Sequence, residues 1–228
     1  MAFTYEYPRP ALTVDCVIFG FKEEGLKLLL IQRSEYPFRG EWALPGGFVE
    51  MEESLDQAAR RELEEETGVK NVYIEQLHTF GGMDRDPRGR TVTVAYYSLV
   101  NLDDYPPRAG SDAQRAKWFP IHEVPKLAFD HQDILACAIK RLQRQVRYEP
   151  VGFELLPEKF TLNQLQRLYE TVLNREFDRR NFWRKFKRMG VLVQTEERKK
   201  GKFRPAVLYR FDEKKYIELK KEGLKFIF

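Results

Sequence analysis

Three glutamates in the first half of the chain have the residue type and spacing of a divalent metal site. Glu62 lies three residues before Glu65 and four before Glu66, so on an α-helix the three carboxylates share one face. Like charges at these spacings repel one another, and they lie at the helix end whose dipole favours cations. Hard oxygen ligands suit Mg²⁺ or Mn²⁺. The simpler alternative is a solvated acidic face, which is what we expect of Glu64.

The helix that positions these glutamates is predicted over residues 54–67. Ser54 and Gln57 have the spacing of a capping box, and Gly68 follows the last turn, where a left-handed residue commonly ends a helix. Apolar residues recur along one face, which should lie against the core: Leu55, Ala58, Ala59 and Leu63.

The residues around this helix resemble the Nudix box. Nine positions of that 23-residue signature are specified, and all nine are met: Gly47, Glu53, Arg61, Glu62, Leu63, Glu65, Glu66, Gly68 and Val69. The resemblance implies a loop–helix–loop on an α/β/α sandwich with a mixed sheet. It also implies hydrolysis of a nucleoside diphosphate linked to another moiety.

The resemblance implies a role for each residue of the acidic helix. Glu62, Glu65 and Glu66 are the implied ligands of Mg²⁺ or Mn²⁺, together with the backbone carbonyl of Gly46. The side chains of Glu53 and Arg61 orient them, and these two complete the implied catalytic set. A divalent cation neutralises the diphosphate, polarises it and lowers the pKa of bound water.

The general base stays open at this point. Glu66 is the preferred candidate, and Asp112 and Glu123 are alternatives from a later loop. Many relatives have a glutamate upstream of a tryptophan in this region, but this chain has GSDAQRAKW there.

Residues 81–90, GGMDRDPRGR, are predicted to form a loop that contacts the substrate. Arg85, Arg88 and Arg90 carry planar guanidinium groups that match phosphate oxygens, although a solvated turn is the alternative.

Other polar and aromatic residues near the expected site are given structural roles. Asp130 is predicted to be the N-cap of a helix over residues 131–146. Trp42 and Phe48 are predicted to pack rather than to stack on a base. His78 and His122 have no neighbour that suggests a metal site.

Charge is divided unevenly along the chain, which predicts two domains. Residues 1–148 carry a net charge of −4 and residues 149–228 one of +8. Strand-like apolar runs are expected in the first part at residues 12–21, 26–33 and 91–100, the first two as a hairpin. The first domain is therefore predicted over residues 1–148 and the second over 149–228.

The second part resembles a winged helix-turn-helix. Helices are predicted over 161–173, with Thr161 as N-cap, and over 178–190, and two strands within 191–211 surround a basic tip. Four residues of the second helix are expected to point inward: Phe182, Trp183, Phe186 and Met189. The expected DNA contacts come from the other face and from the wing: Arg180, Asn181, Arg184, Lys185, Lys187, Arg188, Lys199, Lys200, Lys202 and Arg204. A solvated basic helix is the alternative.

A Nudix domain followed by a winged helix resembles the Nudix-related transcriptional regulators. That resemblance implies a homodimer, a double-stranded DNA partner, and ADP-ribose or a sugar phosphate as ligand. Three functions stay open. The preferred one is a Mg²⁺-dependent pyrophosphohydrolase of ADP-ribose or a related nucleotide sugar whose tail binds DNA. The alternatives are a regulator that only senses its ligand and an enzyme whose tail serves dimerisation.

The remaining sequence features argue against other classes of protein. The apolar runs are too short to cross a bilayer, and the first residues lack a signal-peptide pattern. Cys16 and Cys137 stand in apolar contexts, so we expect reduced core thiols and not a disulfide scaffold. A cytoplasmic protein without a membrane partner is predicted.

Overall fold

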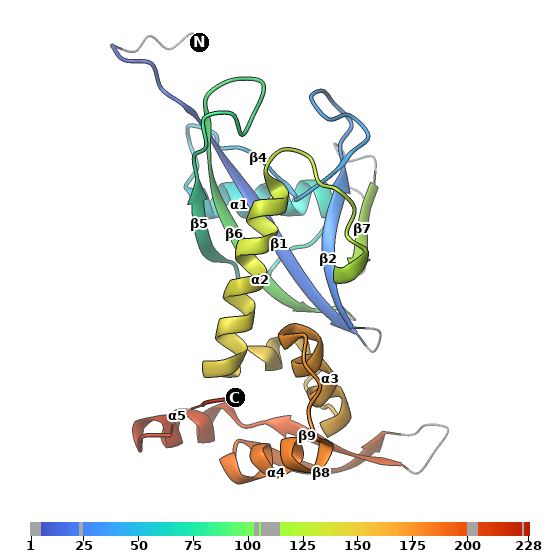
Figure 1. Cartoon of the computed structure of the whole chain (residues 1–228). Helices are drawn as coiled ribbons and strands as arrows, with labels where there is room; N and C mark the ends of the chain where they lie inside the picture. The colour runs from blue at the N-terminus through green and yellow to red at the C-terminus, as the bar shows by residue number, and fades with distance from the viewer. Residues whose placement is uncertain (1–5, 23–24, 103–104, 106–114, 200–204, 225) are drawn as a thin grey trace. The chain divides into compact units, whose positions relative to one another are not determined.

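The computed structural model describes residues 6–22, 25–102, 105, 115–199, 205–224 and 226–228 (Figure 1). The chain divides into two compact units. The first contains residues 1–19, 27–99 and 105–138, and the second contains 20–26, 100–104 and 139–228. None of the helices in the described ranges is both long and apolar enough to cross a membrane.

A seven-stranded sheet is the centre of the α/β fold. Five strands run in the order β3-β2-β1-β6-β5, while β4 pairs with β1 and β7 pairs with β2. The strands are β1 (Ala11–Lys22), β2 (Gly25–Gln32), β3 (Trp42–Ala43), β4 (Gly46–Phe48), β5 (Glu75–Phe80), β6 (Thr91–Asn101) and β7 (Arg115–Pro120). The predicted strands and hairpin of this part are confirmed.

The sheet is covered on both faces, as strand β1 shows. Successive side chains of a strand point to opposite faces. Cys16 donates its thiol hydrogen to the Ala59 carbonyl of helix α1 (Leu55–Thr67), while the neighbouring Asp15 meets His131 at the start of helix α2 (His131–Tyr148). Nine consecutive residues of β1 are buried, as expected for a strand packed on both sides. The predicted α/β/α arrangement is therefore confirmed.

Helix α1 begins and ends where the sequence predicts. The Ser54 hydroxyl accepts from the Gln57 amide and the Gln57 side chain accepts from the Ser54 amide, which completes the capping box. Gly68 ends the helix in the left-handed region at φ 72°. The last turn carries no basic residue, so the helix dipole does not stabilise its glutamates.

The second unit contains a winged helix. Its elements are the 3₁₀ helix η2 (Pro150–Leu155), α3 (Leu162–Leu173), α4 (Arg179–Met189), the antiparallel pair β8 (Leu192–Lys199) and β9 (Ala206–Phe211), and α5 (Glu213–Lys221). A shorter 3₁₀ helix, η1 (Ile121–Glu123), belongs to the first unit. Both predicted helices and both predicted strands of the tail are confirmed, whereas α5 was not predicted.

Aromatic rings form the core of this winged helix. Tyr169 of α3 and Phe186 of α4 are fully buried with their ring centroids 5.3 Å apart, and Phe228 stacks on Phe186 at 5.2 Å. Helix α3 begins with a capping box from Thr161, as predicted, and α4 begins with Asp178 accepting from the Asn181 amide. The charged face of α4 is thereby left to solvent.

Candidate ligand pocket and nucleic-acid interface

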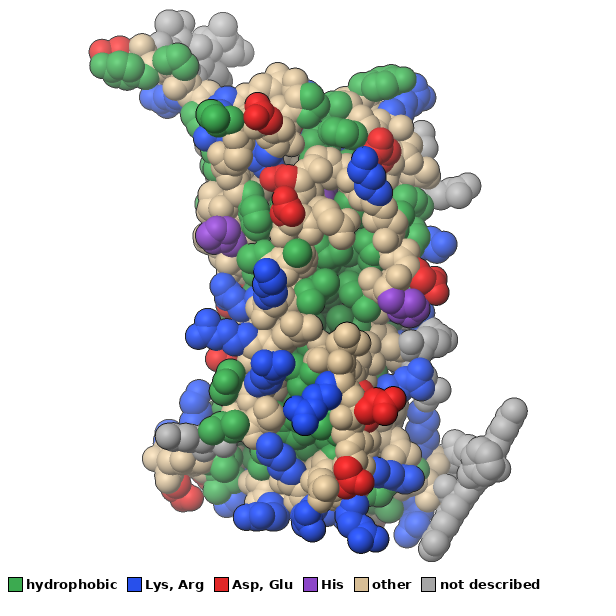
Figure 2. Space-filling view, in the orientation of Figure 1, with side chains coloured by type: hydrophobic (Ala, Val, Ile, Leu, Met, Phe, Trp, Pro, Cys, Tyr) green, Lys and Arg blue, Asp and Glu red, His purple; other side chains and the backbone are tan. Residues whose placement is uncertain are grey.

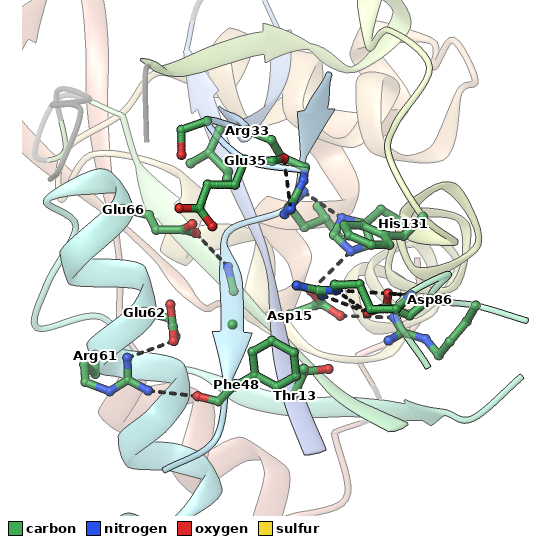
Figure 3. A pocket seen from close by; sticks show the side chains of 18 of the residues that line it. Thr13, Asp15, Arg33, Glu35, Phe48, Arg61, Glu62, Glu66, Asp86 and His131 are labelled. Carbon is green, nitrogen blue, oxygen red and sulfur yellow. Dashed lines mark hydrogen bonds and ion pairs between the residues drawn. The ribbon is translucent and has the colours of Figure 1, made fainter. Parts of the chain in front are cut away.

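A cavity of about 490 Å³ opens at the edge of the sheet in the first unit. Its walls come from strands β1, β2 and β4, from α1, from the loop over residues 81–90 and from the start of α2. Figure 3 shows an acidic wall that contains Glu62 and Glu66 on one side of the cavity and His131 with Asp86 on the other, while Arg33 and Phe48 lie between the two sides. The cavity therefore brings opposite charges to one small space.

Glu62 and Glu66 are the two glutamates of the triplet that face the cavity. Burial raises the pKa of Glu66 to about 8, an effect to which Glu62 and Asp15 add and which the hydrogen bond from the Gly46 amide at 2.8 Å opposes. Burial also raises the pKa of Glu62, although Arg61 opposes it. Two neighbouring carboxylates with raised pKa values form a suitable site for a cation.

Arg61 holds the acidic residues of the box in place. Its guanidinium donates to Glu53 at 2.7 and 3.0 Å, to Glu62 at 2.8 Å and to Glu65 at 3.2 Å. It also donates to the backbone carbonyl of Phe48 at 3.1 Å. These hydrogen bonds lower the pKa of Glu53 and raise that of Arg61. The orienting arrangement implied for Glu53 and Arg61 is present in the fold.

The glycines beside Glu62 and Glu66 are required by close approach. A Cβ at Gly47 would lie 2.3 Å from Glu62 Oε1, and a Cβ at Gly46 would lie 2.1 Å from the Val14 carbonyl oxygen. Gly46 also has φ 156°, which residues with side chains rarely adopt. Strand β4 can therefore lie beside β1 only with glycine at position 46, and a side chain at position 47 would displace the Glu62 carboxylate.

Glu65 is placed differently from the other two glutamates. Its side chain is 47% exposed, bonds Arg61 and does not line the cavity. Among the residues that the structure describes, no three histidine, cysteine or carboxylate side chains are grouped as a ready cation site. Glu62 and Glu66 offer the hard oxygen atoms that Mg²⁺ prefers, so the donor chemistry of this wall fits a divalent cation. The roles of Glu65 and of the Gly46 carbonyl stay predictions.

The three arginines of the loop over residues 81–90 lie in different surroundings. Arg85 lines the cavity but is buried, and it donates to both oxygens of Asp130 at 2.7 and 2.9 Å and to Asp15 at 3.4 Å. Arg88 lines the cavity with a side chain that is 40% exposed and pairs with Asp86 at 2.7 Å. Arg90 donates to the Gly81 and Gly82 carbonyls and is not part of the cavity wall.

Other side chains of the cavity were not predicted from the sequence as site residues: Asp15, Arg33, Phe129 and His131. His131 accepts from the Leu44 amide through Nδ1 at 3.0 Å, so its proton lies on Nε2, which faces Asp15 at 3.3 Å. Burial alone would raise the pKa of Asp15, but His131, Thr93 and Arg85 together lower it. A carboxylate inside the apolar run LTVDCVIFGF was the signal available in the sequence.

The structural roles expected for several neighbouring residues have mixed outcomes. Trp42 packs against Phe119 at 4.7 Å, as predicted. Phe48 was predicted to pack as well, which is wrong, since it is 46% exposed on the cavity wall. Asp130 immediately precedes α2, at the N-cap position predicted for it, and its carbonyl accepts from the Ile134 amide, while its carboxylate accepts from Arg85.

The remaining residues named from the sequence lie away from the cavity wall. His78 packs on Phe80, and His122 lies on the surface 3.4 Å from Glu123. Glu123 therefore stays only a prediction as a base. Asp112 lies outside the described residues.

Helix α4 presents a basic surface in the second unit. Figure 2 shows Lys and Arg side chains gathered over the elements of this unit. The α4 residues predicted to contact DNA are all exposed: Arg180, Asn181, Arg184, Lys185, Lys187 and Arg188. Lys199, at the end of β8, is exposed as well. Lys200, Lys202 and Arg204 lie outside the described residues.

Fewer side chains of α4 are buried than predicted. Phe182 and Phe186 are buried, whereas Trp183 and Met189 are only half-buried. The Arg179 guanidinium lies 4.2 Å from the Trp183 ring centroid, and both line a hollow on the basic face. Lys185 turns towards Phe228, 4.6 Å from its ring centroid, and burial lowers its pKa.

Comparison with known proteins agrees with both halves of this description. Residues 9–142 match the NUDIX domain, and residues 152–211 match the NrtR DNA-binding winged helix domain. The ADPR responsive transcriptional repressor NtrR of Acinetobacter baylyi is 41% identical over 210 residues, which are 90% of this chain and 84% of that protein. The chain belongs to the NrtR family of Nudix-related transcriptional regulators.

Two solved structures of NrtR from Shewanella oneidensis are similar to this member of the family. One is complexed with a 27mer DNA and has a TM-score of 0.73, at 38% identity over 88% of this chain and 93% of that one. The other is the NUDIX domain complexed with ADP ribose, with a TM-score of 0.56 at 42% identity over 60% and 90% of the two chains. The predicted family and fold are confirmed.

A catalytic relative also matches the Nudix part. The ADP-ribose pyrophosphatase of Methanocaldococcus jannaschii is 40% identical over 129 residues, which are 57% of this chain and 73% of that protein. Nudix hydrolases generally use divalent metals such as Mg²⁺.

Proposed function

We propose that this protein is a DNA-binding transcription regulator whose Nudix domain binds ADP-ribose together with a divalent cation. One observation carries the proposal: the chain joins a cavity that gathers carboxylates and arginines to a winged helix whose α4 has an exposed basic face. Its relatives include an ADPR responsive transcriptional repressor and a NUDIX domain complexed with ADP ribose, which suggest the ligand and the regulatory role. We place the domain boundary between residues 148 and 149, and a DNA partner implies a cytoplasmic location.

The carboxylates and arginines of the cavity suit the two ends of a charged ligand complex. Glu62 and Glu66, with Glu65 and the Gly46 carbonyl as further candidates, would hold Mg²⁺ or Mn²⁺, which neutralises a bound diphosphate. Arg88 can give up Asp86 for a phosphate oxygen, since its side chain is 40% exposed. Arg85 is held by two carboxylates, so we assign it to positioning the wall, and Arg90 is the weakest of the three candidates for a phosphate contact.

The exposed face of α4 suits the DNA major groove, with Lys199 and the basic tip beyond it as the wing. Lys and Arg side chains contact phosphates and base edges there. A homodimer would present two such helices to two half-sites one helical turn apart.

The test is a titration of ADP-ribose against operator binding. Fluorescence anisotropy would follow the DNA upstream of the protein's own operon, with Mg²⁺ present. We expect binding that weakens as salt rises and that changes when ADP-ribose is added. Arg184→Ala should weaken DNA binding and leave ADP-ribose binding unchanged. DNA binding that ignores ADP-ribose at saturating concentration would contradict the proposed regulation.

Hydrolysis of ADP-ribose is the second candidate. It is supported by the hydrogen bonds from Arg61 to Glu53 and Glu62 and by the position of Glu62 and Glu66 on the cavity wall. Water would add to one phosphorus of the diphosphate, and the bond from that phosphorus to the bridging oxygen would break. The products are AMP and ribose 5-phosphate, and a carboxylate accepts the released proton. AMP release by wild type that Glu66→Gln reduces at least tenfold supports turnover. Equal and negligible release by both would leave ligand binding alone.

A further inference from the structure

A groove of about 480 Å³ lies in the second unit, lined by the 3₁₀ helix η2, the end of strand β9 and helix α5. Its floor is apolar and includes Val151, Phe153 and Phe211, and Ile217 of α5 borders it with 46% of its surface exposed. Helix α4, which the structure describes in full, contributes no residue to the groove. The groove is therefore separate from the side chains that we assign to DNA, and exposed apolar surface of this kind marks an interaction site.

The floor of the groove is fixed by the core of the winged helix. The half-buried rings of Phe153 and Phe211 stack with their centroids 4.2 Å apart. Phe153 also contacts the buried ring of Phe160 at 5.5 Å, and Phe211 contacts Tyr216 at 5.8 Å. The backbone of Phe160 exchanges two hydrogen bonds with Tyr209, at 2.8 and 2.9 Å. The aromatic floor is thus preformed, which reduces the entropy that a partner must lose on binding.

The rim of the groove is acidic in a part of the chain that is otherwise basic. Residues 149–228 contain 12 Asp or Glu and 20 Lys or Arg, a net charge of +8. Four of the twelve acidic residues line the groove, and all four are exposed: Glu149, Glu154, Glu158 and Glu213. Among the basic residues that the structure describes, Lys220 alone lines it, so the lining has a net charge of −3. Such a rim repels nucleic acid and attracts a cationic partner.

We propose that this groove docks a basic amphipathic segment of another protein. Apolar side chains of that segment pack on Phe153, Phe211 and Ile217, and its Lys and Arg side chains pair with the glutamates of the rim. The apolar floor supplies most of the affinity, while the exposed carboxylates select a cationic partner and speed its approach. A helix with apolar residues along one face and basic residues beside them matches both features. The protein thus has a protein-binding surface in addition to its DNA-binding surface.

The experiment measures binding of a synthetic peptide to the full chain by fluorescence anisotropy. The probe is a labelled peptide of about 14 leucine and lysine residues at helical spacing, and its counterpart has the same composition in scrambled order. The amphipathic peptide should bind saturably and at least about tenfold more tightly than the scrambled one. Its affinity should fall as salt rises.

Ile217→Glu separates apolar docking from attraction by charge. The change adds negative charge to the groove, yet it should weaken peptide binding by roughly tenfold because it removes an apolar contact. The matched control is Ile227→Glu, since Ile227 is 51% exposed in the same unit and does not line the groove. The control should change the affinity by less than about twofold. Both variants should keep the wild-type circular dichroism spectrum.

Neutralising the rim tests the charge complementarity. Glu158→Gln combined with Glu213→Gln should weaken peptide binding by about threefold at low salt and by little at high salt. The control pair is Glu176→Gln with Glu222→Gln, two exposed glutamates of the same unit that do not line the groove. Equal losses from the two pairs would overturn the proposal, because the charge of the whole unit would then attract the peptide.

Three other results would overturn the proposal. The first is peptide binding by Ile217→Glu at the wild-type affinity or above, or equal binding of the scrambled peptide. The second is displacement of the peptide by an equal concentration of spermidine, which would make the groove a site for small organic cations. The third is a smaller oligomer of Ile217→Glu in sedimentation, which would place a second copy of this chain in the groove. The proposed function would stand in each case, since none of these measurements involves ADP-ribose or DNA.

Discussion

The charged side chains of the Nudix cavity and those of helix α4 lie in opposite environments. Glu62 and Glu66 are largely buried, lie beside each other and have raised pKa values. The arginines of α4 are exposed along one helix face. Buried charges interact strongly and only in one geometry, whereas exposed charges are screened by water and salt. The cavity is therefore built for a small ligand of defined shape, and α4 for a long polyanion.

The largest expected effect on stability concerns Arg85, whose guanidinium is buried at the cavity wall. Arg85→Met would leave Asp15 and Asp130 without their shared partner, and breaking a buried ion pair commonly costs about 3–5 kcal/mol. We expect the free energy of unfolding in urea to fall by that amount.

Arg184→Met on α4 is the matched control for this change. Its side chain is exposed, so the same substitution should alter the free energy of unfolding by less than about 0.5 kcal/mol. Equal losses for the two variants would break the distinction between buried and exposed charge.

The second expected effect is that Glu66→Gln stabilises the metal-free protein at high pH. The pKa of Glu66 is about 8 in the folded protein against 4.5 ordinarily, so the folded state holds this proton more tightly than the unfolded state. The free energy of unfolding therefore falls as the pH rises between these values. In EDTA, Glu66→Gln should raise the free energy of unfolding by about 2 kcal/mol at pH 9, where Glu66 must ionise, and by little at pH 5. Gln can still accept from the Gly46 amide, so this hydrogen bond is kept.

Thermal unfolding at the two pH values would measure this stabilisation. Saturating Mg²⁺ should reverse the order at pH 9, since a cation bound to the folded state stabilises only the protein that binds it. A metal-free Glu66→Gln protein that is less stable than wild type at pH 9 would show that this carboxylate is satisfied without a cation.

Local spacing predicted α1 and its caps well, because these residues lie within about twenty positions of one another, whereas the role of Arg61 and Glu53 was implied by the resemblance to the Nudix box. The contact between Asp15 and His131 could not be predicted in the same way. It joins β1 to the start of α2 across the sheet, and nothing in either segment's periodicity specifies the other. Phe48 was misjudged because its apolar side chain favours burial, whereas the cavity beside it exists only in the assembled fold.

Helical spacing alone did not predict the position of Glu65 or the existence of helix α5. The fold places Glu65 outside the cavity, 47% exposed and bonded to Arg61, although its helical spacing puts it with Glu62. Helix α5 was missed because its short sequence, EKKYIELKK, buries only Tyr216 and so has little apolar periodicity.

A smaller effect is expected for Arg184→Ala on the salt dependence of DNA binding. Each lost phosphate contact should reduce the slope of log affinity against log salt by about 0.9. Arg184→Ala should show this change and weaken binding about tenfold or less at 0.1 M salt, measured by anisotropy. Glu66→Gln without ligand should leave the slope unchanged. A slope that Arg184→Ala leaves unaltered would mean that this side chain does not contact a phosphate.

The smallest expected effect is at Glu64, between the residues whose charge matters. Glu64 is 54% exposed and faces Lys70 at 3.4 Å, a surface pair whose contribution is at most about 1 kcal/mol. Glu64→Gln should leave Mg²⁺ and ADP-ribose affinity unchanged by calorimetry and shift the free energy of unfolding by less than about 0.5 kcal/mol. It has the same charge change as Glu66→Gln and lies only two residues away. A loss of Mg²⁺ affinity in Glu64→Gln that equalled the loss in Glu66→Gln would mean that total helix charge, and not burial at the cavity wall, holds the cation.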